Sequence, residues 1–156
     1  DTAEQAIDSA WQARKPAYQL LQADLKAAGP AAAIFITGDF NEPSFRDWTA
    51  AAAAAGIHPL VVDWPFSRAI EALGFTDVFR AVHPDPVEKP GFTWSPNITA
   101  ATTDDHPDRI DFIFARGVGI EILSAHIVGE AGPWSDRVVE PWPSDHRAVV
   151  ATISLP

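Results

Sequence analysis

Three short segments of the sequence gather carboxylates with an amide or an imidazole, each beside an apolar run. They read GDFNE, DRIDFIF and SDHRAVV, and their candidate reactive residues are Asp39, Asn41, Asp108, Arg109, Asp111, Asp145 and His146. A strand that only fills a core does not need such polar groups at its end. If folding brings the segments together, a bound divalent cation would explain the surplus of carboxylates and would supply positive charge for a phosphate substrate.

Each segment alone also has a structural interpretation. A single Asp after a strand is more often a turn or capping residue than a reactive group. A single His is more often a hydrogen-bonded surface or core residue than a catalyst. Asp111 stands inside a predicted strand, on the face opposite three large apolar side chains, so it needs a polar partner if it is buried. His146 is a suitable partner, and the segments are therefore more informative together than singly.

Together the segments resemble the motifs of the endonuclease/exonuclease/phosphatase superfamily, the DNase-like metal-dependent phosphodiesterases. GDFN resembles its strongest motif, DRIDFIF resembles its R-I-D-[FY] strand, and SDHRAV resembles its S-D-H-x-[AP]-V ending. FTW, residues 92–94, resembles a fourth and weaker motif. Because the first three occur in the family's order, chance is a poor explanation of the match.

The resemblance implies a role for each matched residue. Asp39 would orient or deprotonate the attacking water, and Asn41 would hydrogen-bond the substrate phosphate. His146 would contact the scissile phosphate and stabilise its charge, while Asp111 would orient the imidazole. An Asp–His pair fixes the tautomer of the ring and favours its cationic form, which suits this role.

The same resemblance indicates how a metal and a substrate would be held. Asp39 and Asp145 are expected to bind the metal, directly or through water. Oxygen ligands and the absence of Cys suit Mg²⁺ or Mn²⁺ better than Zn²⁺. Trp94, in the FTW segment, and Arg109, at the start of the RID motif, are expected to contact the substrate.

Other polar residues are less informative in the sequence. Asp104, Asp105 and His106 could suggest a second metal site, but their spacing also suits a solvated loop before a strand, which is the interpretation we favour. His58 belongs to no cluster that the sequence reveals. Of the six tryptophans, Trp94 has the strongest case for a role in binding, because it belongs to the FTW segment.

The elements that must position these residues follow from hydrophobic periodicity. Residues 1–28 predict a helix in which Pro16 causes a kink or a division into two pieces. The apolar run 32–37 predicts a buried strand. Ser44 and Asp47 form an S-x-x-D capping pattern for a helix through the alanine run that follows.

The remaining elements expected are a helix at 65–73, short strands within 75–82 and 91–96, and longer strands at 109–115, 119–128 and 147–155. Apolar and polar side chains alternate in residues 109–115, which places Ile110, Phe112 and Phe114 on one face. The order of helix, strand, helices and then strands predicts one mixed α/β (α+β) layered domain.

The resemblance implies a four-layer sandwich of the DNase-I-like type, of which residues 1–156 would supply the C-terminal half. That half would be one mostly antiparallel β-sheet with helices packed on it. The family's N-terminal half carries a metal-binding Glu and a T-H motif, and neither is recognisable in this sequence. A half-sandwich would expose an apolar sheet face, so we expect the missing N-terminal half as a partner, either a cleaved fragment or a second chain. The isolated chain is expected to be nearly inactive.

The composition limits the function further. A formal net charge of -10 argues against broad electrostatic capture of nucleic acid, and no sequence-specific nucleic-acid reader is visible. No apolar run approaches the roughly 18 residues of a transmembrane segment. The sequence identifies no compartment, so secreted, periplasmic and cytoplasmic locations all stay open.

The function that these observations predict is hydrolysis of phosphate esters with the help of a divalent metal. A phosphodiesterase that acts on a small or lipid-headgroup phosphate is the first interpretation, because the acidic chain does not favour a long polyanion. A metal-dependent nuclease of the same superfamily is one alternative. A non-catalytic binding domain, or an inactive fragment that keeps the fold, is the other.

Overall fold

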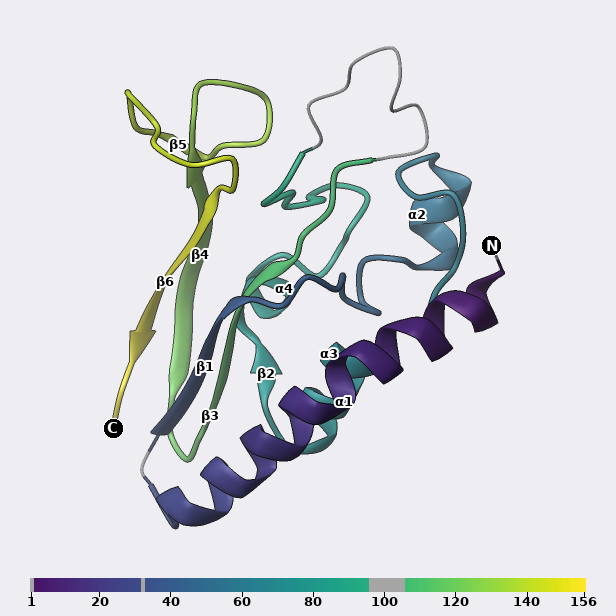
Figure 1. The fold of residues 1–156 in the computed structure, drawn as a ribbon. Coiled ribbons are helices and arrows are strands. Elements are labelled where there is room, and N and C mark those ends of the chain that lie inside the picture. The colour runs from purple at the N-terminus through teal and green to yellow at the C-terminus, as the bar shows by residue number, and fades with distance from the viewer. Residues whose placement is uncertain (1, 32, 96–105) are drawn as a thin grey trace.

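The structure of the protein is a computed structural model in which residues 2–31, 33–95 and 106–156 are described (Figure 1). Its helices are α1 (Ala3–Ala28), α2 (Ala50–Ala54), α3 (Pro65–Ala72) and α4 (Val78–Val82). Its strands are β1 (Ala33–Asp39), β2 (Thr76–Asp77), β3 (Asp111–Gly117), β4 (Glu121–Gly129), β5 (Arg137–Val138) and β6 (Ala148–Ser154). The predicted mixture of helices and strands is confirmed.

The described strands form two three-stranded sheets, with the orders β1-β3-β2 and β5-β4-β6. The sequence predicted one sheet, and this prediction is wrong. Strand β3 pairs with β1 along one edge and with β2 along the other, so it has no edge left for β4. Within the second sheet, β4 is antiparallel to β6 and parallel to the short β5, which the sequence did not predict.

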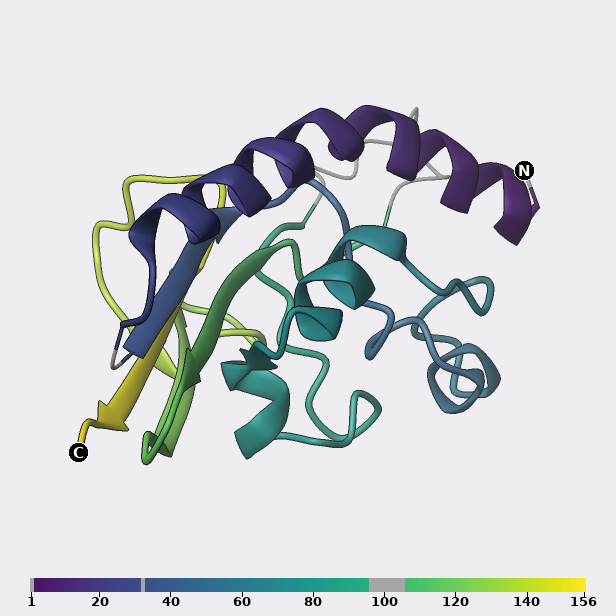
Figure 2. The same ribbon diagram turned by 90° about the horizontal axis from the view of Figure 1, so that it is seen from below.

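Strand β3 is the centre of the packing because its two faces serve two different clusters. Phe112 and Phe114 pack with α3 and with the partly buried apolar side chains of α1. Ile113 and Ala115 face the other cluster, which α4 forms with strands β4 and β6. The predicted alternation of β3 is therefore confirmed, and Figure 2 shows α1 lying along one side of the sheet that β3 centres.

Helix α1 is a single element that passes Pro16 without interruption, so the predicted division into two pieces does not occur. Its N-terminus carries a capping box between Thr2 and Gln5. Trp11 and Tyr18 lie on either side of the proline, and their ring centroids are 5.5 Å apart. This contact and the packing of Tyr18 on the core offset the hydrogen bond that proline cannot make.

Helix α2 is shorter than predicted, because the predicted capping box does not form. Thr49 is the N-cap, and its hydroxyl accepts a hydrogen bond from the amide of Ala52. Ser44 instead accepts from the amide of Arg46 within a turn. Asp47 is buried and pairs with arginines, which removes it from any capping role.

Strand β1 is not the buried strand that its apolar sequence predicted. Among the described strands it pairs with β3 alone, which makes it an edge strand, and Phe35 is 42% exposed. Val150 of β6 is also exposed. Apolar side chains of both sheets thus reach the surface of this chain, although the predicted half-sandwich itself stays a prediction.

The other predicted strands differ in extent. The segment 75–82 contains only the two residues of β2 before α4 begins. In the segment 91–96, Trp94 forms isolated bridges with Asp108 and His146, and Pro96 lies outside the described residues. In the part of the chain that the structure describes, no helix combines the length and apolarity needed to cross a bilayer.

Candidate active site

The ends of three strands bring the first group of predicted residues together. Asp39 ends β1 and Asp111 begins β3, and the antiparallel register places them directly opposite each other. His146 precedes β6, whose start lies at the same end of the sheets (Figure 1). Carboxylate oxygens of Asp39 and Asp111 and a ring nitrogen of His146 lie within 4.8 Å of one another.

The imidazole of His146 is fixed by Asp111. The Nδ1 atom lies 2.9 Å from Oδ2 of Asp111. Partial burial lowers the pKa of His146, but the hydrogen bond and the charge of Asp111, with the charges of Asp39 and Asp145, outweigh burial and raise it. With Nδ1 donating to the carboxylate, Nε2 is the nitrogen left to contact a substrate oxygen in cationic form.

Asp39 organises the loop that follows β1. Its two carboxylate oxygens accept from the backbone amide of Asn41 at 2.7 Å and from the side-chain amide of Asn41 at 2.9 Å. Asn41 has a φ of 47°, a left-handed conformation that Asn adopts more readily than most residues. Arg14 of α1 donates to the carbonyl of Asn41 at 2.7 Å, which anchors the loop to the helix.

Asp145 and Trp94 lie beside this group but are not part of it. Asp145 is exposed, and its charge contributes to the raised pKa of His146. Among the described residues, the ligand atoms of this group that lie within 4.8 Å of one another come from Asp39, Asp111 and His146 and do not include Asp145. The backbone of Trp94 bridges that of His146, so the FTW segment borders the site. Their roles in metal and substrate binding stay predictions.

Arg109 was expected to contact the substrate, but its side chain is completely buried, which corrects this expectation. The guanidinium makes paired hydrogen bonds with Asp47, at 2.9 and 3.1 Å, and with Asp77, at 3.1 and 2.7 Å. Burial lowers its pKa, but the two carboxylates raise it by more, so Arg109 stays charged. We therefore assign it a structural role.

Arg80 completes this buried network. Its Nε donates to Oδ1 of Asp47 at 2.5 Å, and its other nitrogens donate to the carbonyls of His83, Lys89 and Pro90. Two arginines thus balance two aspartates away from water, and every charge has a partner. The network ties the loop after Asn41 to the start of β3, so it holds two parts of the site in register.

Thr93 is a positioning residue that the sequence did not single out. Its buried hydroxyl accepts from the amides of Ile110 and Asp111, at 3.0 and 3.1 Å. Its carbonyl accepts from the amide of Arg147 at 2.6 Å. One residue therefore connects the strand of Asp111 with the residue after His146. Its place at the centre of FTW was the available signal.

Glu42 is a second residue that sequence reasoning missed. It is 3% exposed, and Oε1 accepts from the amide of Phe66 at the start of α3 at 2.7 Å. Its Oε2 atom is buried and has no hydrogen-bond partner. Burial raises the pKa of Glu42 to about 7 against the opposing effects of the Phe66 amide and Arg14.

The raised pKa of Glu42 makes stability depend on pH in a defined window. The folded state holds a proton that the unfolded state releases near pH 4.5, so the free energy of unfolding falls as pH rises from about 4.5 to about 7. Glu42→Gln should remove this fall, and above pH 7 its free energy of unfolding should exceed that of the wild type by about 3 kcal/mol. Urea unfolding at pH 5 and pH 8 measures both values. Glu88→Gln, at an exposed position, is the control and should leave the slope unchanged.

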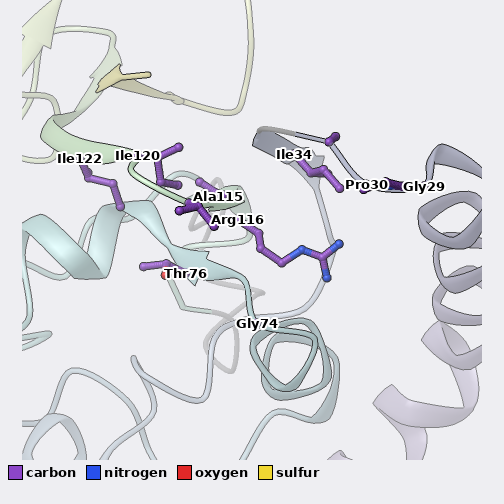
Figure 3. Close-up of a pocket in the computed structure, with 12 residues that line it drawn as sticks. Gly29, Pro30, Ile34, Gly74, Thr76, Ala115, Arg116, Ile120 and Ile122 are labelled. Atoms are coloured by element: carbon purple, nitrogen blue, oxygen red, sulfur yellow. The ribbon is translucent and has the colours of Figure 1, made fainter. Parts of the chain in front are cut away.

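The pockets of the molecule differ in their relation to the site. One pocket of about 330 Å³ is lined by Arg14, Asp39, Asn41 and Phe66, among others, and so includes part of the site. Another, of about 590 Å³, lies at the opposite end of β1 and β3 and is shown in Figure 3. Its charged side chain, Arg116, donates to the carbonyl of Leu73. This second pocket is not part of the candidate site.

Two comparisons with known proteins show what this chain is similar to. A model described as the Endonuclease/Exonuclease/phosphatase family matches residues 4–146, a range that contains every member of the site. The protein named "Uncharacterized protein F14F9.5" from Caenorhabditis elegans is 39% identical over 126 residues. The match covers 76% of this chain but 40% of that protein, so the chain spans less than half the length of this relative.

Proposed function

Because the chain belongs to the endonuclease/exonuclease/phosphatase family, whose members are generally hydrolases of phosphoester bonds, we propose that it is a divalent-metal-dependent phosphodiesterase. The observation that carries this proposal is the meeting of Asp39, Asp111 and His146 within 4.8 Å at the strand ends. A non-catalytic domain would have no need for this combination of two carboxylates and an oriented imidazole.

Each residue of the group has a chemical task in the proposed reaction. Asp39 accepts the proton of the attacking water, which its exposed carboxylate can reach. One N–H of the Asn41 side chain is engaged by Asp39, and the other is left to donate to a phosphate oxygen. Cationic His146 donates through Nε2 to the oxygen on which negative charge develops.

The donor set of the group fits a hard divalent cation. Carboxylate oxygens of Asp39 and Asp111 lie close together, with Asp145 near enough to influence His146. Mg²⁺ and Mn²⁺ prefer such oxygen ligands, and Asp39 with Asp145 would hold the ion. When bound, the ion would offset the negative charge of the phosphate.

The proposed substrate is a small or lipid-headgroup phosphodiester. The net charge of -10 does not favour a long polyanion, whose capture needs many cationic side chains. A substrate that presents only one or two phosphates needs only the local positive charge of the ion and His146. A nuclease of the same superfamily is the alternative that the substrate test below separates.

The proposal includes a partner, the N-terminal half of the same domain. The C. elegans relative is longer than the matched region, and exposed Phe35 and Val150 offer apolar surface to such a partner. A metal-binding Glu and a T-H motif would come from that half. Assays should therefore use protein expressed from the complete gene, with this chain alone as a comparison that we expect to be nearly inactive.

A substrate panel tests the proposed function. Bis-p-nitrophenyl phosphate, sphingomyelin, inositol phosphates and plasmid DNA are each assayed with Mg²⁺ and with EDTA. We expect hydrolysis of a small or lipid diester that EDTA abolishes and added Mg²⁺ restores. Preferential cleavage of plasmid DNA would favour the nuclease. Turnover that persists in EDTA, or no turnover on any substrate, would contradict the proposed phosphodiesterase.

A further inference from the structure

A second cluster of metal-ligating side chains lies outside the group of Asp39, Asp111 and His146. One ring nitrogen each of His58 and His106 and a carboxylate oxygen of Asp108 lie within 4.8 Å of one another. His58 follows α2, whereas His106 and Asp108 precede β3. The sequence indicated no cluster for His58 and favoured a solvated loop for His106. Asp104 and Asp105 lie outside the described residues.

The two imidazoles of this cluster present buried nitrogens that lack hydrogen bonds. Nδ1 of His58 and Nε2 of His106 are both inaccessible to solvent and have no hydrogen-bond partner. The side chain of His58 is only 3% exposed. Buried polar atoms are nearly always satisfied, so two orphaned nitrogens in one small cluster require an explanation.

Two separations in the cluster are slightly longer than those between two ligands of one ion. Nδ1 of His58 lies 3.8 Å from Oδ1 of Asp108, and Nε2 of His106 lies 3.7 Å from Oδ2. These separations are too long for hydrogen bonds. Two ligands bound tetrahedrally to one zinc ion would be roughly 3.3 Å apart, so only a small adjustment would be needed.

The protonation state of His58 suits metal binding. Burial, opposed by the charge of Asp47 and assisted by His106 and Arg80, lowers the pKa of His58 to about 4. The ring is therefore neutral at neutral pH, and a neutral imidazole is the form that binds metals. A cationic His58 paired with Asp108 is thus not what holds the cluster together.

Trp48 supports all three side chains of the cluster. Its indole Nε1 donates to Oδ1 of Asp108 at 2.9 Å. Its ring stacks on His58, with centroids 4.6 Å apart, and lies 5.0 Å from His106. Side chains that bind metals are commonly oriented by such neighbouring hydrogen bonds. The ligands are therefore held in place by the fold.

We propose that His58, His106 and Asp108 bind one zinc-like transition-metal ion. Two imidazoles and one carboxylate are a donor set that suits Zn²⁺, with a fourth position for water, and they differ from the oxygen ligands expected to hold Mg²⁺ at the candidate active site. The ion would connect the segment after α2 to the residues that enter β3, and Asp111 follows Asp108 by three positions. Its role is to position the start of β3.

Zinc titration of the metal-stripped protein tests this site. Isothermal titration calorimetry should count one Zn²⁺ in an Asp39→Asn background, in which the candidate active site lacks one of its two proposed metal ligands. The affinity should fall by about a hundredfold or more in His58→Phe, which keeps an aromatic ring against Trp48, and in His106→Gln. The control, His126→Gln, removes a histidine outside the cluster and should keep the site.

Two further readouts make the result independent of catalysis. Zn²⁺ should raise the thermal unfolding midpoint of the Asp39→Asn protein by several degrees, and this rise should be lost when His106→Gln is added. Co²⁺ should give the visible absorption of a four-coordinate site only when both histidines are present. Equal zinc stoichiometry in all variants would overturn the proposal. Because His106 is partly exposed, His106→Gln decides the question even if His58→Phe does not fold.

Discussion

Replacing Asp39 by Asn should lower metal-dependent phosphodiester hydrolysis by about a hundredfold or more. An amide can neither take a proton from water nor supply the negative charge that a divalent ion requires. The fold should be unaffected, because Asp39 is exposed and the Asn oxygen can still accept from the amide of Asn41. Turnover at saturating Mg²⁺ and urea unfolding of the same preparation measure the two effects.

The control for this experiment is Asp63→Asn. Asp63 is a similarly exposed carboxylate that pairs with Arg68 on the surface. Its loss should leave turnover unchanged and cost under about 1 kcal/mol of stability. Near-normal turnover in Asp39→Asn would refute the role of Asp39 in activating water. A large loss of stability in that variant would mean instead that its carboxylate is structural.

Replacing Arg109 by Met should lower the free energy of unfolding by about 3–5 kcal/mol. The variant leaves Asp47 and Asp77 buried with only Arg80 to balance their charges. The guanidinium also lies 4.5 Å from the ring centroid of Phe112, a contact that Met keeps in part. The destabilisation therefore comes mainly from the uncompensated carboxylates. Urea unfolding at pH 7 measures it.

Arg68→Met is the matched control for the buried arginine. Arg68 pairs with Asp63, and both side chains are more than half exposed. This replacement should change stability by less than about 1 kcal/mol, because surface ion pairs contribute little. A similarly small change in Arg109→Met would contradict the structural role of Arg109. It would also restore the possibility that this side chain moves out to meet a ligand.

Local sequence patterns predicted which segments form helices and strands better than they predicted which of these elements are buried. The alternation in residues 109–115 predicted the two faces of β3, because the period of a strand is independent of its neighbours. The apolar run of β1 suggested a buried strand, yet Phe35 is exposed. Burial depends on which other elements cover a strand, and these cannot be identified from the residues of the strand itself.

The candidate site was predictable only through the family resemblance. Residues 39, 111 and 146 are far apart in the chain, and antiparallel pairing of β1 with β3 brings the first two together. The S-x-x-D pattern at Ser44 gave a wrong helix start. The sequence does not show that Arg109 and Arg80 would pair with Asp47 and so keep it from capping the helix. Long-range ion pairs override a local capping preference when both partners are buried.

The cluster of His58, His106 and Asp108 shows the same limit. His58 stands 48 residues before His106, and His106 stands two residues before Asp108. This spacing is not typical of a metal motif. Only the packing of both histidines around Trp48 brings them together. Such a site can be recognised from tertiary contacts but not from sequence patterns.

The contacts of Thr93 with the strand of Asp111 and with Arg147 have a consequence for how the proposed enzyme would use substrate binding energy. Because one buried hydroxyl and one carbonyl hold the strand of Asp111 and the residue after His146, the Asp–His pair exists before any ligand arrives. Groups fixed in this way do not have to be assembled at the moment of reaction. Binding energy from the rest of a substrate can then go into aligning the phosphorus with the attacking oxygen.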